Sequence, residues 1–357
     1  MLVRWIAALI AFLVVAGIGI VAIGDFSSDA AANSWAIVAA IGLLVAFVVY
    51  AGIEYAQTGG FASIGRQFDL RTLVLMPVAI AINIILGAAV ANALKIPIYL
   101  DSIGTILVGA LAGPIPGALT GFVTNILWQY VIPPPFQGTV AAPFAIVAAV
   151  IGLLAGIFGR VGWLRPRIGR PISQLFLGGL AATAIVAGLG YYAYTRFYAG
   201  GLEFFKPENT DPVFVVLGWF TAFLFVAFIV GFLALLFIRR DLTVAYVTIA
   251  GVVTGVVAAL ISAPISANLF SGVTGSGTDF LVAAFRQAGS DIQAATFQQG
   301  LLSDPIDKLV TFFAVYLVLN AMATRIKARF PQGERLIARE DVVTPTDDDA
   351  QWRGASA

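Results

Sequence analysis

The most informative part of the chain reads Ile96-Pro-Ile-Tyr-Leu-Asp-Ser-Ile-Gly-Thr, an apolar run, and then Gly113-Pro-Ile-Pro-Gly-Ala-Leu-Thr-Gly-Phe-Val-Thr-Asn125. A carboxylate, Asp101, therefore opens a hydrophobic segment. As a helix, residues 102–112 would span about 16 Å, against about 30 Å for the hydrocarbon core of a bilayer. Short segments interrupted by Gly and Pro at membrane depth are typical of solute sites in transporters. The alternative is an ordinary tight helical hairpin in which Asp101 only caps a helix.

Composition places the chain in a membrane. Hydrophobic residues make up 60% and charged residues 11% of the 357 residues, and the mean hydropathy is +0.96. A soluble domain is not this apolar, so we predict an all-α, polytopic integral membrane helical bundle in the cell membrane. The net charge of +1 and the lack of a long basic run argue against a nucleic-acid partner.

The absence of His and Cys from the sequence narrows the chemistry. It removes a His general base, a Cys nucleophile, a disulfide and a His/Cys zinc site. The sequence also lacks the Gly-x-x-x-x-Gly-Lys-Ser/Thr loop that binds ATP phosphates. We therefore expect no enzymatic activity and no cofactor, and active transport would need a partner ATPase or an ion gradient.

Hydrophobic segments recur along the whole chain, and the first of them is expected to be a retained helix rather than a cleaved signal peptide. We predict about 8–10 transmembrane segments, the number depending on whether 101–131 is a re-entrant hairpin or two spanning helices. The predicted segments are 1–23, 34–55, 72–93, 101–112, 115–131, 141–159, 172–195, 213–238, 241–262 and 304–324.

Basic residues set the orientation, because cytoplasmic loops are enriched in Lys and Arg. With the N-terminus inside, 15 of the 20 basic residues fall on the cytoplasmic side and 5 on the outer side. Both termini are therefore predicted to be cytoplasmic.

The chain divides into four parts. We predict an N-terminal two-helix membrane hairpin at 1–56, a cytoplasmic linker at 57–71, and a membrane core at 72–326. The core carries an outer loop and amphipathic segment at 263–303. A polar cytoplasmic tail, partly disordered, is expected at 327–357.

Polar residues near the outer ends of the helices form the candidate site. The helix before Ser262 is predicted to end near Ile261, and the last membrane helix to begin at Asp304-Pro305. Lys308 in that first turn suggests an acidic partner, an anionic ligand group or snorkelling to headgroups. For each polar residue an interhelical hydrogen bond is the structural alternative. The candidate substrate-binding residues are Tyr99, Asp101, Asn125, Trp128, Gln129, Asn268, Asp279 and Asp307. In this hypothesis Asp101, Asp279 and Asp307 accept ligand N–H groups, while Tyr99 and Trp128 stack on an aromatic ring.

The run from Leu100 to Ala110, followed by Gly113 to Gly121, resembles the substrate-binding membrane subunit, or S component, of energy-coupling factor (ECF) transporters. The resemblance covers roughly 72–195. It implies a subunit that captures a vitamin or similar micronutrient from outside and docks, through faces of small residues, onto a transmembrane coupling subunit with two cytoplasmic ATPases. Typical members have six helices and about 200 residues, so this chain would be an enlarged variant.

Two other functions fit the same sequence. Gly/Pro-rich hairpins also resemble membrane-embedded small-molecule sensors, although the cytoplasmic tail is too short for a kinase or cyclase domain. An ion-coupled secondary transporter is the other alternative.

Overall fold

The structure, a computed structural model, describes residues 2–24, 29–94, 98–194 and 212–338. Over these ranges the ordered elements are all helices, as predicted. The part of the predicted tail beyond residue 338 lies outside the described residues.

Six helices of the described chain are long and apolar enough to cross a bilayer, so the protein is a multi-pass membrane protein. Two shorter apolar helices, Ile103–Ala112 and Val226–Ile238, lie beside them. The six candidate spans are Val3–Ile23, Ile41–Thr58, Leu70–Val90, Ala142–Arg160, Ile172–Tyr192 and Thr243–Phe270.

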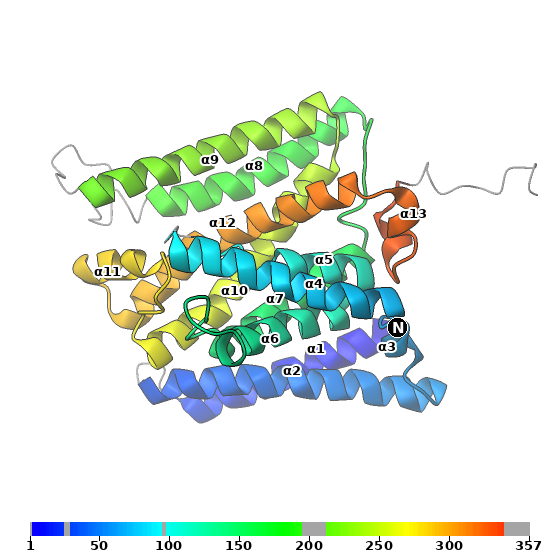
Figure 1. The fold of residues 1–357 in the computed structure, drawn as a ribbon, viewed down its shortest axis with the longest axis horizontal. Coiled ribbons are helices and arrows are strands. Elements are labelled where there is room, and N and C mark those ends of the chain that lie inside the picture. The colour runs from blue at the N-terminus through cyan, green and yellow to red at the C-terminus, as the bar shows by residue number, and fades with distance from the viewer. Residues whose placement is uncertain (1, 25–28, 95–97, 195–211, 339–357) are drawn as a thin grey trace, which may run out of the picture.

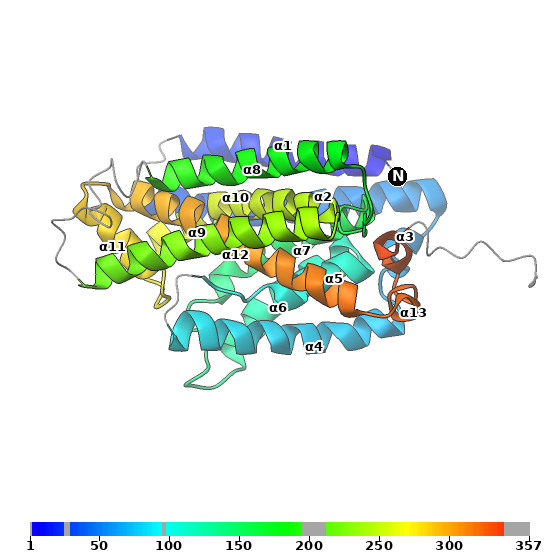
Figure 2. The same cartoon turned by 90° about the horizontal axis from the view of Figure 1, so that it is seen from above.

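The helices run along one common direction and form a core flanked by two helix pairs (Figure 1 and Figure 2). One flanking pair is α1 (Leu2–Ile23) with α2 (Asp29–Thr58), and the other is α8 (Ile172–Tyr194) with α9 (Pro212–Ile238). Both pairs contact α10. The core helices are α4 (Leu70–Gly87, continued by the π-helical turn η1, Ala88–Ala93), α5 (Ile103–Ala112), α6 (Pro114–Tyr130), α7 (Ala145–Arg160), α10 (Thr243–Phe270) and α12 (Ile292–Ala321).

Basic residues from distant parts of the sequence meet at one end of the bundle. Arg71 donates to the carbonyl of Arg329 at 3.1 Å, and Arg165 donates to the carbonyl of Arg335 at 3.1 Å. Arg335 in turn donates to the carbonyl of Arg160. The short helices α3 (Ala62–Gly65) and α13 (Thr324–Lys327) lie at this same end (Figure 1). The distribution of basic residues predicts that this end is cytoplasmic, and it is called the cytoplasmic end below.

The Gly-Pro-x-Pro-Gly turn at residues 113–117, called the corner below, lies at this cytoplasmic end. Gly113 has a φ of +134°, which favours glycine, and a Cβ there would meet the side chain of Gln67. Gln67 accepts from the backbone N–H of Ile115 at 3.3 Å. The N–H of Gln332 donates to the carbonyl of Leu111 at 2.8 Å. The linker and the start of the predicted tail are therefore both folded against the corner, the latter through η4 (Gly333–Leu336).

Two helix boundaries differ from the prediction. α10 does not end near Ile261 but continues through Pro264 to Phe270, and α12 does not begin at Asp304 but at Ile292, where Asp291 caps it by accepting from Ala294. Proline is tolerated inside a membrane helix when neighbouring helices and side chains compensate for the missing N–H. Pro305 lies where α12 packs closely against Gly255 of α10. The predicted amphipathic segment is accordingly split into α11 (Asp279–Gln287) and the first turns of α12.

The small-residue faces pack inside the bundle. A Cβ on Gly152 would lie 2.1 Å from the carbonyl oxygen of Gly117, and a Cβ on Gly109 would lie 2.7 Å from that of Gly152. Gly255 meets Pro305 in the same way. These glycines bring α5, α6 and α7, and separately α10 and α12, into backbone contact. These small-residue faces are therefore occupied within the chain.

Candidate functional site

A cavity of about 350 Å³ is lined in part by residues 274–279, which lead into α11. In Figure 1, α11 lies at the end of the bundle opposite α3 and α13. The wall of the cavity is built by the segment 99–102, α6, the segment 135–144, α7, α10, the segment 274–279 and α12. Exposed residues at its rim, among them Pro135, Thr139 and Gly275, connect the cavity to the outer surface. The size falls at the lower end of the range for small-molecule sites, about 300–1,000 Å³.

The short helix α5 explains why the cavity reaches deep into the bundle. Its 10 residues give a helix of about 15 Å, half the thickness of the hydrocarbon core. Every residue from Gly104 to Ala112 is buried, and the C-terminal end meets the cytoplasmic corner. The helix therefore begins near mid-depth, and the space above it is filled by the non-helical segment 98–102. Non-helical backbone is tolerated at this depth because it lies inside the protein and lines a cavity.

Asp101 does not cap this helix. The N-cap residue is Ser102, whose side chain makes no capping hydrogen bond, and the first-turn N–H of Gly104 donates to the side chain of Asn83. Asp101 instead lines the cavity and lies 3.7 Å from the ammonium of Lys308, with a quarter of its side chain exposed. The structure therefore does not support the capping interpretation of the opening motif.

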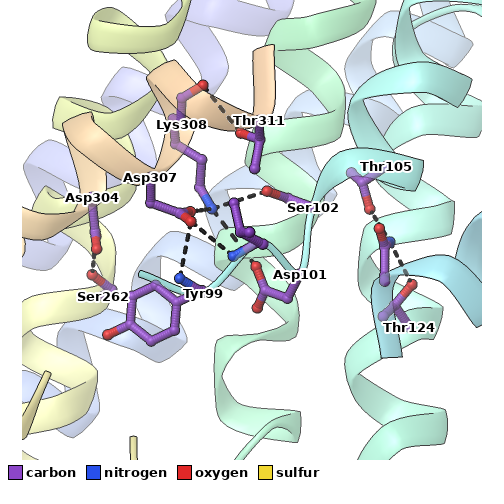
Figure 3. Close-up of polar contacts among 12 residues, drawn as sticks. Tyr99, Asp101, Ser102, Thr105, Thr124, Ser262, Asp304, Asp307, Lys308 and Thr311 are labelled. Atoms are coloured by element: carbon purple, nitrogen blue, oxygen red, sulfur yellow. Dashed lines mark hydrogen bonds and ion pairs between the residues drawn. The ribbon is translucent and has the colours of Figure 1, made fainter. Parts of the chain in front are cut away.

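Lys308 is the centre of a buried ionic cluster (Figure 3). Its ammonium contacts the carboxylate of Asp307, donates to the hydroxyl of Ser102 at 3.0 Å and faces Asp101. Only 3% of Lys308 is exposed. Of the three explanations for this lysine, the acidic partner is the correct one: Asp307 and Asp101 surround it, and it does not reach the headgroups.

Asp307 holds the non-helical segment in place. One of its carboxylate oxygens accepts from the backbone N–H groups of Tyr99 at 2.9 Å and Leu100 at 2.8 Å. Leu100 has a φ of +53°, an unfavourable conformation for a leucine, and these two bonds stabilise it. Asp307 is fully buried and does not line the cavity. Its place in the structure is that of a positioning residue.

Asp304 is a second carboxylate on the cavity wall, and the sequence did not mark it as a site residue. It lies in the middle of α12, is 5% exposed, and accepts from the hydroxyls of Ser262 at 3.0 Å and Ser303 at 3.3 Å. The Asp-Pro pair suggested a helix start, which hid it. The signal that could have found it is a carboxylate one turn before the Asp307-Lys308 pair on the same helix.

Hydroxyl groups and Asp279 form the outer wall. Tyr99 hydrogen-bonds Thr278 at 2.9 Å through its phenol, and Thr278 hydrogen-bonds Ser276 at 2.7 Å. Asp279 accepts from the backbone N–H groups of Thr274 at 3.0 Å and of the following glycine, which closes the 274–279 turn.

Asn125 differs from the other asparagine buried in the core helices. It lines the cavity and is 5% exposed, and among the described residues its side-chain amide has no hydrogen-bond partner. Asn83, by contrast, donates to Thr105 at 2.8 Å and Thr124 at 3.2 Å, and accepts from the N–H of Gly104 at 2.7 Å. Asn125 is thus a polar group available to a bound molecule, whereas the hydrogen bonds of Asn83 link α4 to α5 and α6.

Trp128 packs against the segment 135–144, which is called the rim segment below. Its indole N–H donates to the carbonyl of Phe136 at 2.8 Å, and Gly138 packs closely against its ring, where a Cβ would lie 2.8 Å away. The ring also borders the cavity.

The structure thus brings five of the eight predicted residues to the cavity: Tyr99, Asp101, Asn125, Trp128 and Asp279. Asp307 lies behind the wall. Gln129 faces the rim segment and accepts from the N–H of Ala142, and Asn268 pairs with Gln293. None of these three lines the cavity.

Comparisons of the chain with protein-family models, curated proteins and solved structures gave no match. The resemblance to the S component therefore rests on the residues of the 100–121 stretch alone.

Proposed function

We propose that this multi-pass membrane protein is the substrate-binding subunit of an ATP-driven importer, which captures a micronutrient-sized solute from outside. Partner ATPases and a membrane coupling subunit would supply the energy, because the sequence carries no loop for ATP phosphates. The observation that carries the proposal is the outward cavity with the unpartnered Asn125 amide on its wall.

The closed inner half of the bundle favours a binding subunit over an open channel. Beneath the cavity, α5, α6 and α7 are in backbone contact through Gly109, Gly117 and Gly152. A solute in the cavity would meet this packed layer and could not continue to the cytoplasm without a rearrangement. Docking of a coupling subunit is one source of such a rearrangement, and an ion gradient is the source in the secondary-transport alternative.

The test is the small-molecule content of the purified full-length protein. We expect mass spectrometry of denatured extracts to find a compound in near-stoichiometric amount in the wild type and to find it depleted in N125L. The absence of any enriched compound from both proteins, with unfolding temperatures unchanged across a micronutrient panel, contradicts the proposal. Uptake into vesicles without ATP, abolished by an ionophore, would instead support the ion-coupled transporter.

A further inference from the structure

The charges on the cavity wall are unequal. The lining residues include three carboxylates, Asp101, Asp279 and Asp304, and one cation, Lys308. A fourth carboxylate, Asp307, lies directly behind the wall in contact with Lys308. In the low-dielectric interior of a membrane protein such an excess is costly unless a cation or hydrogen-bond donors compensate for it.

Lys308 is not available to an anionic ligand. An ammonium has three donor positions, and Asp307, Ser102 and Asp101 surround it on three sides. Its charge is also balanced by Asp307, which is fully buried. Among the described residues that line the cavity there is no arginine. An anionic solute would therefore face carboxylates without a free cation to pair with.

Asp304 is held by hydroxyl groups and not by a direct ion pair. Its partners are the hydroxyls of Ser262 and Ser303, and no ion pair to it occurs within the described residues. Asp101 shares a lysine that Asp307 already balances, at the longer distance of 3.7 Å. Both carboxylates line the same cavity as the Asn125 amide, which forms no hydrogen bond within the part of the chain that the structure describes.

We infer that the cavity takes a small, flat organic cation whose charged or N–H-rich edge is bound by Asp304 and Asp101. This inference names the solute class of the proposed binding subunit and rests on that function. The Asn125 amide completes the polar edge. The aromatic rings of Tyr99, Trp128 and Phe144, which also line the cavity, suit a flat cation through ring contact and cation–π attraction. The volume of about 350 Å³ limits the solute to a small molecule.

Three nearly isosteric probes separate charge from shape: benzamidine as the cation, benzamide as the neutral form and benzoate as the anion. Their binding to the purified full-length protein is measured by titration calorimetry. We expect benzamidine to bind at least tenfold more tightly than the other two. We expect its affinity to fall about tenfold in D304N and in D101N. D304N is the cleaner variant, since it leaves Lys308 with all its partners and an amide oxygen still accepts from Ser262.

The matched control is D69N. Asp69 caps α4 at the cytoplasmic end by accepting from Thr72, and asparagine caps equally well. Benzamidine affinity should be unchanged in this variant.

Three outcomes overturn the inference: benzoate or benzamide binding as tightly as benzamidine, benzamidine binding unchanged in both cavity variants, or no binding of any probe. The proposed function is tested separately by the extracted compound. A neutral or anionic compound bound in near-stoichiometric amount would preserve that function and overturn only the solute class.

Discussion

At the scale of single residues, the site is defined by which buried polar groups already have partners. Asn83 and Asp307 are fully hydrogen-bonded within the protein and hold helices or backbone in place. Asn125 and Asp304 border the cavity. Within the described residues Asn125 forms no side-chain hydrogen bond, and Asp304 accepts only from two serine hydroxyls. Burial alone does not distinguish the two groups, because all four side chains are buried.

The two asparagines give a matched pair of substitutions. N83L should lower the free energy of unfolding by about 1–3 kcal/mol, because it leaves the N–H of Gly104 without an acceptor. N125L should change the free energy of unfolding by less than about 1 kcal/mol, because Asn125 forms no hydrogen bond within the described residues and faces the cavity. Thermal unfolding of the ligand-free protein in detergent measures both. Equal destabilisation by the two changes would contradict the assignment of Asn125.

Asp307 gives a second prediction at this scale. D307N should weaken solute binding about tenfold or more although residue 307 does not line the cavity, because the segment carrying Tyr99 and Leu100 loses a charge-assisted anchor. Binding calorimetry, with proteolysis to detect loosening of residues 98–102, measures the effect. Full affinity in D307N would show that the anchor is dispensable.

At the scale of helices, glycine contacts set the architecture beneath the site. Gly117 and Gly152 allow α6 and α7 to touch backbone to backbone. The sequence showed these spacings but not which faces they occupy, since helical period alone does not tell an internal partner from an external one. The same limit applies to Pro264 and Pro305. The local rule predicts a helix end before Pro264 and a helix start at Pro305, but α10 and α12 continue through these residues.

A glycine pair tests this packing. G152A places a methyl group 2.1 Å from a carbonyl oxygen and should destabilise the protein by about 1–3 kcal/mol. G188A lies on α8 with open space around it and should be neutral or stabilising by up to about 1 kcal/mol. Unfolding midpoints in the same detergent compare the two. The packing account is wrong if G152A is as stable as G188A.

At the scale of the whole molecule, the bundle has two different ends. At the basic end, predicted to be cytoplasmic, arginine side chains hydrogen-bond backbone carbonyls of distant segments. The opposite end encloses a cavity. Sequence reasoning predicted the all-α membrane class, because composition and segment length determine it. It also predicted five residues of the cavity wall. It missed Asp304, and it placed Gln129 and Asn268 at the cavity, because helix rotation and the path of the rim segment depend on tertiary packing rather than on local pattern.

The absence of cysteine from the sequence makes the orientation directly testable. Single cysteines replace Arg66 and Val273, both exposed and at opposite ends of the bundle. In intact cells, a membrane-impermeant maleimide should label V273C and not R66C, and R66C should react after lysis. The reverse pattern would invert the predicted topology.

The central claim is that the cavity opens outward and favours cations, and the most direct test is the modification of a cysteine placed inside it. Ser266 lines the cavity and is 7% exposed. In intact cells, S266C is treated with two small impermeant methanethiosulfonates, the cationic trimethylammonium-ethyl and the anionic sulfonato-ethyl reagent. We predict reaction from outside, at least tenfold faster with the cation than with the anion after normalisation to V273C. Reaction only after lysis, or equal normalised rates with both reagents, would contradict the account.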